Sequence, residues 1–171
     1  MSRPLARRAA ALAVAAVTAL AAAPAARAAT APSGTAGGGS GAGWAKVHIC
    51  DTAKHPDDVG VRASMPGTPR GTARRMRFRL QYRDGGRWRY VQGADSGWRP
   101  LSRARGLPVE LGWTFGVTPQ SARVAFRGVV RFRWLRDGAV VLHRLRTTEA
   151  GHPATVGADP DGYSAATCSI G

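Results

Sequence analysis

In two stretches of the sequence, arginine recurs at every second or every fourth residue. The first row comprises Arg75, Arg77 and Arg79, and the second comprises Arg123, Arg127, Arg131 and Arg133. A guanidinium group can donate two parallel hydrogen bonds to a phosphate or a carboxylate. The rows therefore favour anionic partners, such as teichoic acids, acidic polysaccharides, extracellular DNA or acidic protein surfaces. Binding of this kind weakens steeply as salt is added.

Arg87 and Arg89 would lie near the first row if the Asp84-Gly85-Gly86 turn closes a tight hairpin. An alternative interpretation of both rows needs no ligand. Among the 25 Lys and Arg residues only Lys46 and Lys54 are lysine, so this composition supplies arginine wherever an outward position is basic. Arginine covers sheet surface with its methylene stem and protects edges from aggregation. Alternation already requires polar residues at these positions, which favours this alternative.

Residues for other kinds of chemistry form no recognised constellation. His48 and Cys50 would point to one face of a strand and could begin a metal site, but no further ligand has a suitable spacing. The segment from Asp159 to Gly162 resembles the start of a calcium loop, lacks the later acidic ligands, and is expected to be a turn. No G-x-S-x-G, H-E-x-x-H or phosphate-cradling motif accompanies the histidines. We expect neither an enzyme nor a cofactor or metal. The histidines considered as the general base of a hydrolase are His48, His55, His143 and His152.

The arginine rows lie in segments with the period-two pattern of β-strands. Between Arg75 and Arg83, arginine and glutamine alternate with Met76, Phe78, Leu80 and Tyr82. No segment after residue 28 shows a helical period. Residues 93–100 are expected to form a loop, in which Trp98 either folds back onto the core or is exposed. The predicted strands are 44–50, 59–64, 75–83, 87–91, 109–117, 122–135, 139–146 and 163–169.

Short strands separated by turn residues predict an all-β protein. A chain of 171 residues has room for one folded domain, which we place at residues 44–171. Asp137-Gly138 is a strong hairpin signal, and Gly112 and Gly116 mark places where a strand bulges or another strand comes close. We expect an antiparallel immunoglobulin-like or fibronectin type III-like sandwich of about seven strands.

The first 28 residues have the layout of a secretory signal peptide. Arg3, Arg7 and Arg8 precede an apolar run at residues 9–23, and Ala26-Arg27-Ala28 offers a cleavage site. The run is too short and too weakly apolar to cross a bilayer. We expect cleavage after Ala28 and an extracellular protein, with the Sec and Tat routes both open. Residues 29–43 contain only Ala, Gly, Ser, Thr and Pro, which predicts a flexible linker.

The charge and the cysteines fit an exported domain. The whole chain carries 25 Lys and Arg against 10 Asp and Glu, a formal net charge of +15. The signal peptide accounts for only four of the arginines, so most of the excess stays with the mature protein. In an oxidising compartment the two cysteines, Cys50 and Cys168, are expected to form one disulfide that joins the start of the domain to its end.

A distinctive block lies between residues 74 and 148. It includes the segments Met76–Gln81, Ser96-Gly97-Trp98, Val129–Leu135 with Asp137-Gly138, and Arg146-Thr147-Thr148. This block resembles a group of uncharacterised secreted proteins of high-GC Gram-positive bacteria, which look immunoglobulin-like or fibronectin type III-like. The resemblance implies the fold and export and carries no activity. A cysteine tends to follow closely after the Arg-Thr-Thr stretch in that group, whereas here Cys168 lies some twenty residues further on.

Two functions follow as hypotheses. The first is a secreted, non-enzymatic immunoglobulin-like module that recognises an extracellular or cell-envelope protein, with Trp98 and Trp44 as the aromatic contacts to test. The second is electrostatic binding of anionic cell-envelope polymers or extracellular nucleic acid through the arginines. The candidate binding residues are Arg75, Arg77, Arg79, Arg87, Arg89 and Trp98. No membrane span is expected after signal cleavage.

Overall fold

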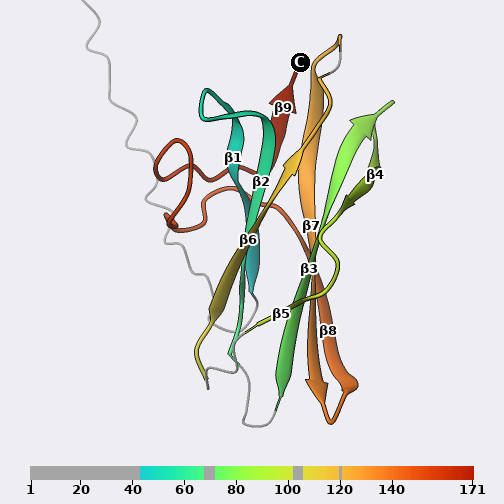
Figure 1. Ribbon diagram of the computed structural model, residues 1–171, viewed down its shortest axis with the longest axis vertical. Helices are drawn as coiled ribbons and strands as arrows, with labels where there is room; N and C mark the ends of the chain where they lie inside the picture. Colours follow the sequence, from blue (N-terminus) through green and yellow to red (C-terminus); the bar gives the residue numbers. More distant parts are fainter. Residues whose placement is uncertain (1–42, 68–71, 102–105, 120) are drawn as a thin grey trace, which may run out of the picture. The chain divides into compact units, whose positions relative to one another are not determined.

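The computed structural model describes residues 43–67, 72–101, 106–119 and 121–171. The predicted signal peptide and all of the predicted linker except Gly43 lie outside these residues. The described residues form nine strands and no helix (Figure 1). Accordingly, no helix in the described part of the chain is long and apolar enough to span a membrane. The strands are β1 (Trp44–Thr52), β2 (His55–Met65), β3 (Ala73–Asp84), β4 (Arg87–Asp95), β5 (Arg99–Pro100), β6 (Val109–Gly116), β7 (Val124–Arg136), β8 (Ala139–Thr147) and β9 (Cys168–Ile170).

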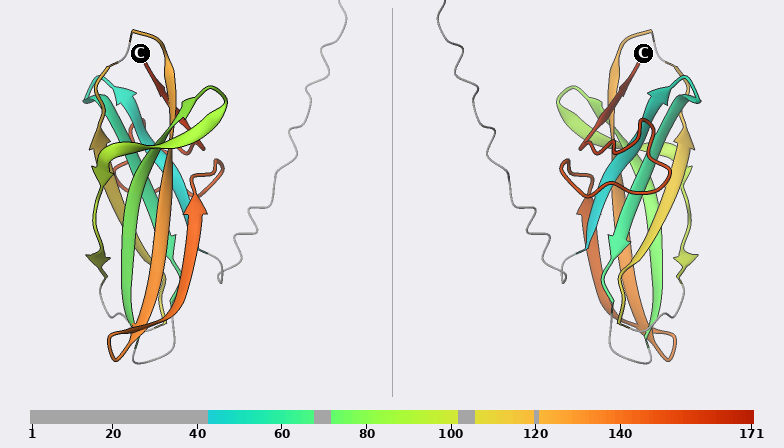
Figure 2. Two further views of the ribbon diagram at one scale, coloured as in Figure 1. Left: turned by 90° about the vertical axis from the view of Figure 1, so that its right-hand side faces the viewer. Right: turned by 90° about the vertical axis from the view of Figure 1, so that its left-hand side faces the viewer.

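The strands form two antiparallel sheets. The smaller sheet has the order β1-β2-β6, and the larger has the order β4-β3-β7-β8, with β5 paired to β3 and β9 paired to β7. Figure 2 shows the larger sheet with β3, β7 and β8 side by side. The predicted all-β, antiparallel fold is confirmed. The predicted hairpin at Asp137-Gly138 is also confirmed, because Arg136 pairs with Ala139 across it.

The core lies between the two sheets and follows from the alternation in the sequence. Met76, Phe78 and Leu80 of β3 are fully buried, and they pack in one cluster with Val59 and Val61 of β2. The inward residues of β7 complete this cluster. Because side chains of a strand alternate between its faces, burying the even-numbered residues of β3 places its odd-numbered arginines on the outer face of the larger sheet.

Two predicted boundaries were wrong. The expected loop at residues 93–100 contains the end of β4 and all of β5. Ser96 joins this region to β3 through its backbone and its hydroxyl group, because Ser96 N–H donates to the Phe78 carbonyl at 2.9 Å and Phe78 N–H donates to Ser96 Oγ at 2.8 Å. Backbone pairing of this kind leaves no hydrophobic pattern to detect. At the other end, the strand predicted for residues 163–169 is confined to β9, and Tyr163 instead closes a turn onto the Pro160 carbonyl.

The segment between β8 and β9 runs across the outer face of the smaller sheet. Its backbone is tied to β1 by bonds from Glu149 N–H to the Ala45 carbonyl and from Asp159 N–H to the His48 carbonyl, both 2.9 Å. Beneath it Lys46 is fully buried, and Lys46 Nζ donates to the Pro153 carbonyl at 2.9 Å. The expected turn from Asp159 to Gly162 belongs to this covering segment.

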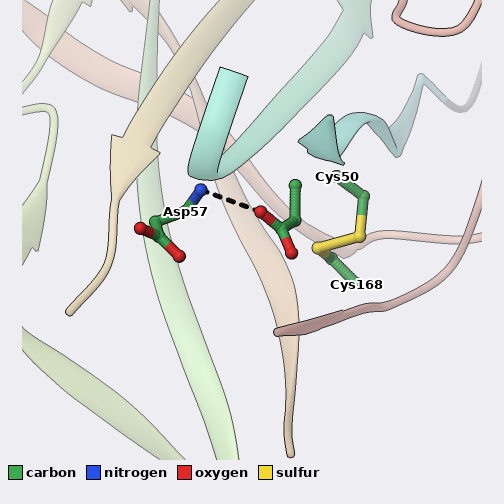
Figure 3. The surroundings of a disulfide bond; sticks show 4 residues. Cys50, Asp57 and Cys168 are labelled. Atoms are coloured by element: carbon green, nitrogen blue, oxygen red, sulfur yellow. Dashed lines mark hydrogen bonds between the residues drawn. A yellow bond between two sulfur atoms is a disulfide. The ribbon is translucent and has the colours of Figure 1, made fainter. Parts of the chain in front are cut away.

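The predicted disulfide is confirmed and fastens the covering segment. Cys50 at the end of β1 is bonded to Cys168 at the start of β9, with their Cα atoms 5.3 Å apart (Figure 3). Beside it, Asp57 N–H donates to Asp51 Oδ1 at 2.9 Å across the turn between β1 and β2. The bond therefore joins the two ends of the folded domain.

Candidate functional site

The outer face of β3 and β7 brings the first arginine row together with Arg127, Arg131 and Arg133 of the second row, whereas Arg123 lies before β7. In the register of the pair, Arg75 lies opposite Arg133, Arg77 lies opposite Arg131, and Gln81 lies opposite Arg127. Residues directly opposite in an antiparallel pair place their side chains on the same face. We call this surface the arginine face. It consists of Arg75, Arg77, Arg79, Arg83, Arg127, Arg131 and Arg133, together with Trp88, Tyr90 and Trp98.

Three aromatic rings support the guanidinium groups of this face. The Arg79 guanidinium carbon lies 3.7 Å from the centre of the Tyr90 ring, and that of Arg127 lies 4.3 Å from the Trp88 ring. The Arg133 guanidinium lies 4.1 Å from the Trp98 ring, so it is held in the same way. Cation–π contacts of this kind fix the planes of the guanidinium groups and limit their freedom. The arginines are therefore partly ordered before any ligand arrives.

Asp95 is the acidic residue that contacts the arginine face. Arg77 Nε donates to Asp95 Oδ1 at 2.8 Å, and Arg79 Nε lies 3.4 Å from Asp95 Oδ2. The hydrogen bond from Arg77 is the main cause that lowers the pKa of Asp95, helped by a backbone N–H from Gly97. Within the described part of the chain, no carboxylate forms an ion pair with the other five arginines of the face. Their charge is therefore not neutralised by the described part of the fold.

The expected position of Arg87 and Arg89 beside the first row was wrong. The hairpin turn contains only Gly85 and Gly86, both at positive φ, so Asp84 pairs with Arg87 and the register differs by one residue from a three-residue turn. Arg87 and Arg89 consequently lie on the face opposite to the first row, where Arg89 Nε contacts Asp84 Oδ2 at 2.8 Å. Trp88 and Tyr90 occupy the places on the arginine face that these arginines were expected to take.

The two tryptophans singled out in the sequence have different surroundings. Trp98 neither folds into the core nor stands fully exposed, because it packs against Arg133 on the arginine face. Trp44 is stacked on His152 of the covering segment, with ring centres 5.1 Å apart. Trp98 is therefore available to a ligand of the arginine face, and Trp44 belongs to the contact that holds the covering segment.

A groove opens where the arginine face meets β8. It has a volume of about 510 Å³ and is lined by Trp98, Arg131, Arg133, Val140, His143 and Leu145, with contributions from Phe132 and Arg144. None of these residues is acidic. The groove thus combines apolar walls with cationic groups, which is the combination that orients an amphipathic, negatively charged ligand.

The suggested pairing of His48 with Cys50 does not occur. A bulge between Val47 and Ile49 turns Cys50 toward the core, where it forms the disulfide, whereas the His48 ring lies over Gly60 on the outer face. Burial lowers the pKa of His48 to about 4. Among the described residues no group of three or more His, Cys, Asp and Glu side chains could hold a metal ion.

The arrangement as a whole is suited to binding oxyanions. Guanidinium groups on two adjacent strands present hydrogen-bond donors to phosphate or carboxylate oxygens, and the rings between them offer apolar contact area. No protein-family model, curated protein or solved structure matches the chain.

Proposed function

We propose that the chain is a secreted, non-enzymatic β-sandwich protein that binds an anionic polymer of the cell envelope through the arginine face. The observation that carries the proposal is the register of β3 and β7, which sets two arginine rows side by side with little acidic compensation. Export is supported by the signal-like first 28 residues and by the disulfide. An immunoglobulin-like or fibronectin type III-like class is supported by the two antiparallel sheets and by the resemblance of residues 74–148.

The cost of the arrangement argues for a ligand. Arg75 faces Arg133, and Arg77 faces Arg131, across adjacent strands. Like charges directly opposite one another destabilise a sheet. A surface that only keeps a protein soluble usually carries charges of both signs. Such mixed charges occur at the β3–β4 hairpin, where Arg89 contacts Asp84. A bound polyanion would remove the repulsion and release counterions at the same time.

The geometry also limits the kind of anion. Arginines two apart on a strand are separated by about 6.5–7 Å, and neighbouring strands by about 4.8 Å, so the face presents a lattice of donors rather than one pocket. A single small anion would engage only one or two of these groups. A polymer with repeated phosphates or carboxylates would engage several arginines at once. This favours teichoic acids, acidic polysaccharides or nucleic acid as the class of ligand.

The proposal is tested by measuring binding to polyphosphate, polyglutamate and double-stranded DNA over a range of salt. The protein is expressed by an exporting host so that the disulfide forms. Arg83→Gln and Arg127→Gln remove charges that lie on Trp88, and each is expected to weaken binding several-fold for all three polymers and to lower the salt slope by about one. Arg87→Gln is the matched control, because it removes the same charge from the opposite face.

The outcomes separate two functions. Equal effects of Arg87→Gln and Arg127→Gln would mean that only net charge matters, and the proposal would be wrong. If Trp98→Ala abolished capture of an envelope protein at high salt while the two arginine variants bound normally, the protein would instead be a recognition module for a specific protein. Recognition of a specific protein is supported by one observation, that Trp98 lines the groove.

A further inference from the structure

Strand β8 forms an edge of the larger sheet and is poorly protected. In the described structure the stretch from Ala139 to His143 makes strand pairs with β7 only. Figure 2 (left) shows β8 at the margin of the sheet beside β7. Four of its apolar side chains are between 43% and 52% exposed, namely Val140, Val141, Leu142 and Leu145. An exposed apolar edge strand is a template on which another strand can pair.

The groove beside β8 supplies the side-chain chemistry for such a pairing. In the register with β7, His143 lies opposite Arg133 and Leu145 opposite Arg131, so these residues share the outer face. They line the groove together with Trp98, which closes it on the side of β3. A strand added to β8 would direct every second side chain toward this outer face, where the groove offers two guanidinium groups and apolar walls.

We propose that β8 binds an extended, acidic peptide segment of a partner protein by strand addition, with alternate carboxylates directed toward Arg131 and Arg133. The main chain of the segment continues the sheet beyond β8. Its remaining side chains contact Val141 and Leu142, which the edge leaves exposed. This interaction goes beyond polymer binding. It requires an extended polypeptide whose backbone N–H and C=O groups can pair with β8, and charge alone does not suffice.

Charge decides against a second copy of this chain as the occupant. Strand β8 contains His143, Arg144 and Arg146 and no acidic residue. Two such strands paired with each other would bring like charges together, beside a groove that already contains Arg131 and Arg133. An acidic segment meets complementary charge at the same positions. The edge therefore fits an acidic partner strand better than itself.

The test uses a fluorescently labelled ten-residue peptide with capped termini, in which valine alternates with glutamate. Fluorescence anisotropy and amide hydrogen exchange are measured with the full chain. We expect binding together with slower exchange in β8, and at least tenfold weaker binding of a peptide with the same charge and two central valines replaced by proline. An alternating valine–lysine peptide is expected not to bind. Equal binding of the proline peptide would overturn strand addition and leave a purely electrostatic contact.

Variants of the protein locate the interaction on β8. Val141 is the residue without a cross-strand partner at the bulge between β7 and β8, so changing it spares the ladder. Val141→Glu is expected to weaken peptide binding at least tenfold, because it adds a like charge beside the acidic peptide as well as removing an apolar contact. Val141→Lys removes only the contact and should weaken binding much less, and the distant Val156→Glu should preserve it. Arg133→Gln should weaken it as well. Equal binding by Val141→Glu and Val141→Lys, both confirmed as folded by their melting temperatures, would contradict the proposal.

Further controls separate this proposal from the proposed function. Arg83→Gln and Arg127→Gln are expected to weaken polymer binding and to leave peptide binding unchanged, because neither residue lines the groove. Peptide binding with no polymer binding would therefore remove the proposed function and keep the strand-addition site, and the converse would do the opposite. A stable dimer in sedimentation that the peptide cannot dissociate would assign β8 to self-association and overturn the proposal.

Discussion

At the scale of single residues, Asp95 divides the arginine face into two parts. It accepts hydrogen bonds from Arg77 and from the backbone of Gly97, and it lies 3.4 Å from Arg79 Nε. Because Arg77 lowers the pKa of Asp95, the carboxylate stays charged and keeps both arginines engaged. The better ligand-binding candidates are then the arginines on β7, together with Arg75 and Arg83 near the two ends of β3. The sequence indicated the first row most strongly, but its acid partner lies 18 positions from Arg77 and could not be assigned.

His48 provides a residue-scale prediction about pH. It is 5% exposed, its Nδ1 atom has no hydrogen-bond partner in the described structure, and burial lowers its pKa from 6.5 to about 4. A backbone hydrogen bond with Gly60 opposes this effect, and the charges of Arg62 and Lys46 add to it. Between pH 6.5 and 4 the unfolded chain therefore binds a proton that the folded chain does not. The free energy of unfolding should fall by up to about 3 kcal/mol as the pH is lowered through this window, and stay level above it.

Urea unfolding at pH 7 and pH 4.5 checks this expectation. His48→Gln removes the titrating group, so its stability should depend less on pH across the same window than that of the parent protein. His143→Gln is the control, because His143 is exposed on β8 and is not among the charges that act on His48, whereas the charge of His55 adds to the lowering of the His48 pKa. An unchanged pH dependence in His48→Gln would show that other groups, such as the partly buried His152, cause the loss.

At the scale of elements, alternation predicted strands well where one face is buried. Strands β3, β6 and β7 lie within two residues of their predicted bounds, because their inward residues are large and apolar, whereas β8, whose apolar residues are exposed, was located by the hairpin signal at Asp137-Gly138. The second half of β4 was missed, since Gln92, Gly93, Ala94 and Asp95 offer no alternation of large apolar and polar side chains. The adjacency of the arginine rows could not be derived either. It depends on β3 pairing with β7 across more than forty residues of chain, and period-two patterns do not reveal partners.

Gly128 on β7 yields an element-scale prediction. A Cβ atom there would lie 2.6 Å from Val61 Cγ1 and 2.8 Å from Thr148 Cγ2, where β2 packs against β7. Val61 is fully buried and has no room to move, so Gly128→Ala should lower the free energy of unfolding by about 1–3 kcal/mol. The measurement is chemical denaturation monitored by tryptophan fluorescence.

Gly112→Ala is the matched control for this prediction. Gly112 also lies within a strand, and the nearest atom to its Cβ position is 3.6 Å away, which is ordinary contact. Gly112→Ala should leave the free energy of unfolding unchanged or raise it slightly, since alanine restricts the unfolded chain more than glycine does. The sequence pointed to Gly112 and Gly116 as places of close approach or bulging, yet β6 pairs with β2 in continuous register. Equal destabilisation by both substitutions would refute the packing argument.

At the scale of the whole folded domain, the disulfide has the largest expected effect. It joins residues 118 positions apart and holds the end of the segment that covers Lys46 and His48. Closing a loop of this length removes conformational entropy from the unfolded chain, for which a stabilisation of about 4–5 kcal/mol is expected. The Cys50→Ala/Cys168→Ala double variant should therefore unfold at much lower urea concentration than the parent protein, and dithiothreitol should shift the parent toward the variant without affecting the variant itself.

The same variant separates stability from function. Its arginine face depends on the pairing of β3 with β7, of which only the Tyr82–Phe126 pair adjoins Cys168, whereas the covering segment depends on β9 and Cys168. At a temperature where the variant is still folded, polymer binding should match that of the parent, while amide exchange near Val47, Ala165 and Asp159 should become faster. Loss of polymer binding from the folded variant would mean that the binding surface includes the covering segment, and the assignment to the arginine face would have to be abandoned. Unchanged exchange in that segment would show instead that its hydrogen bonds to β1 hold it without the covalent link.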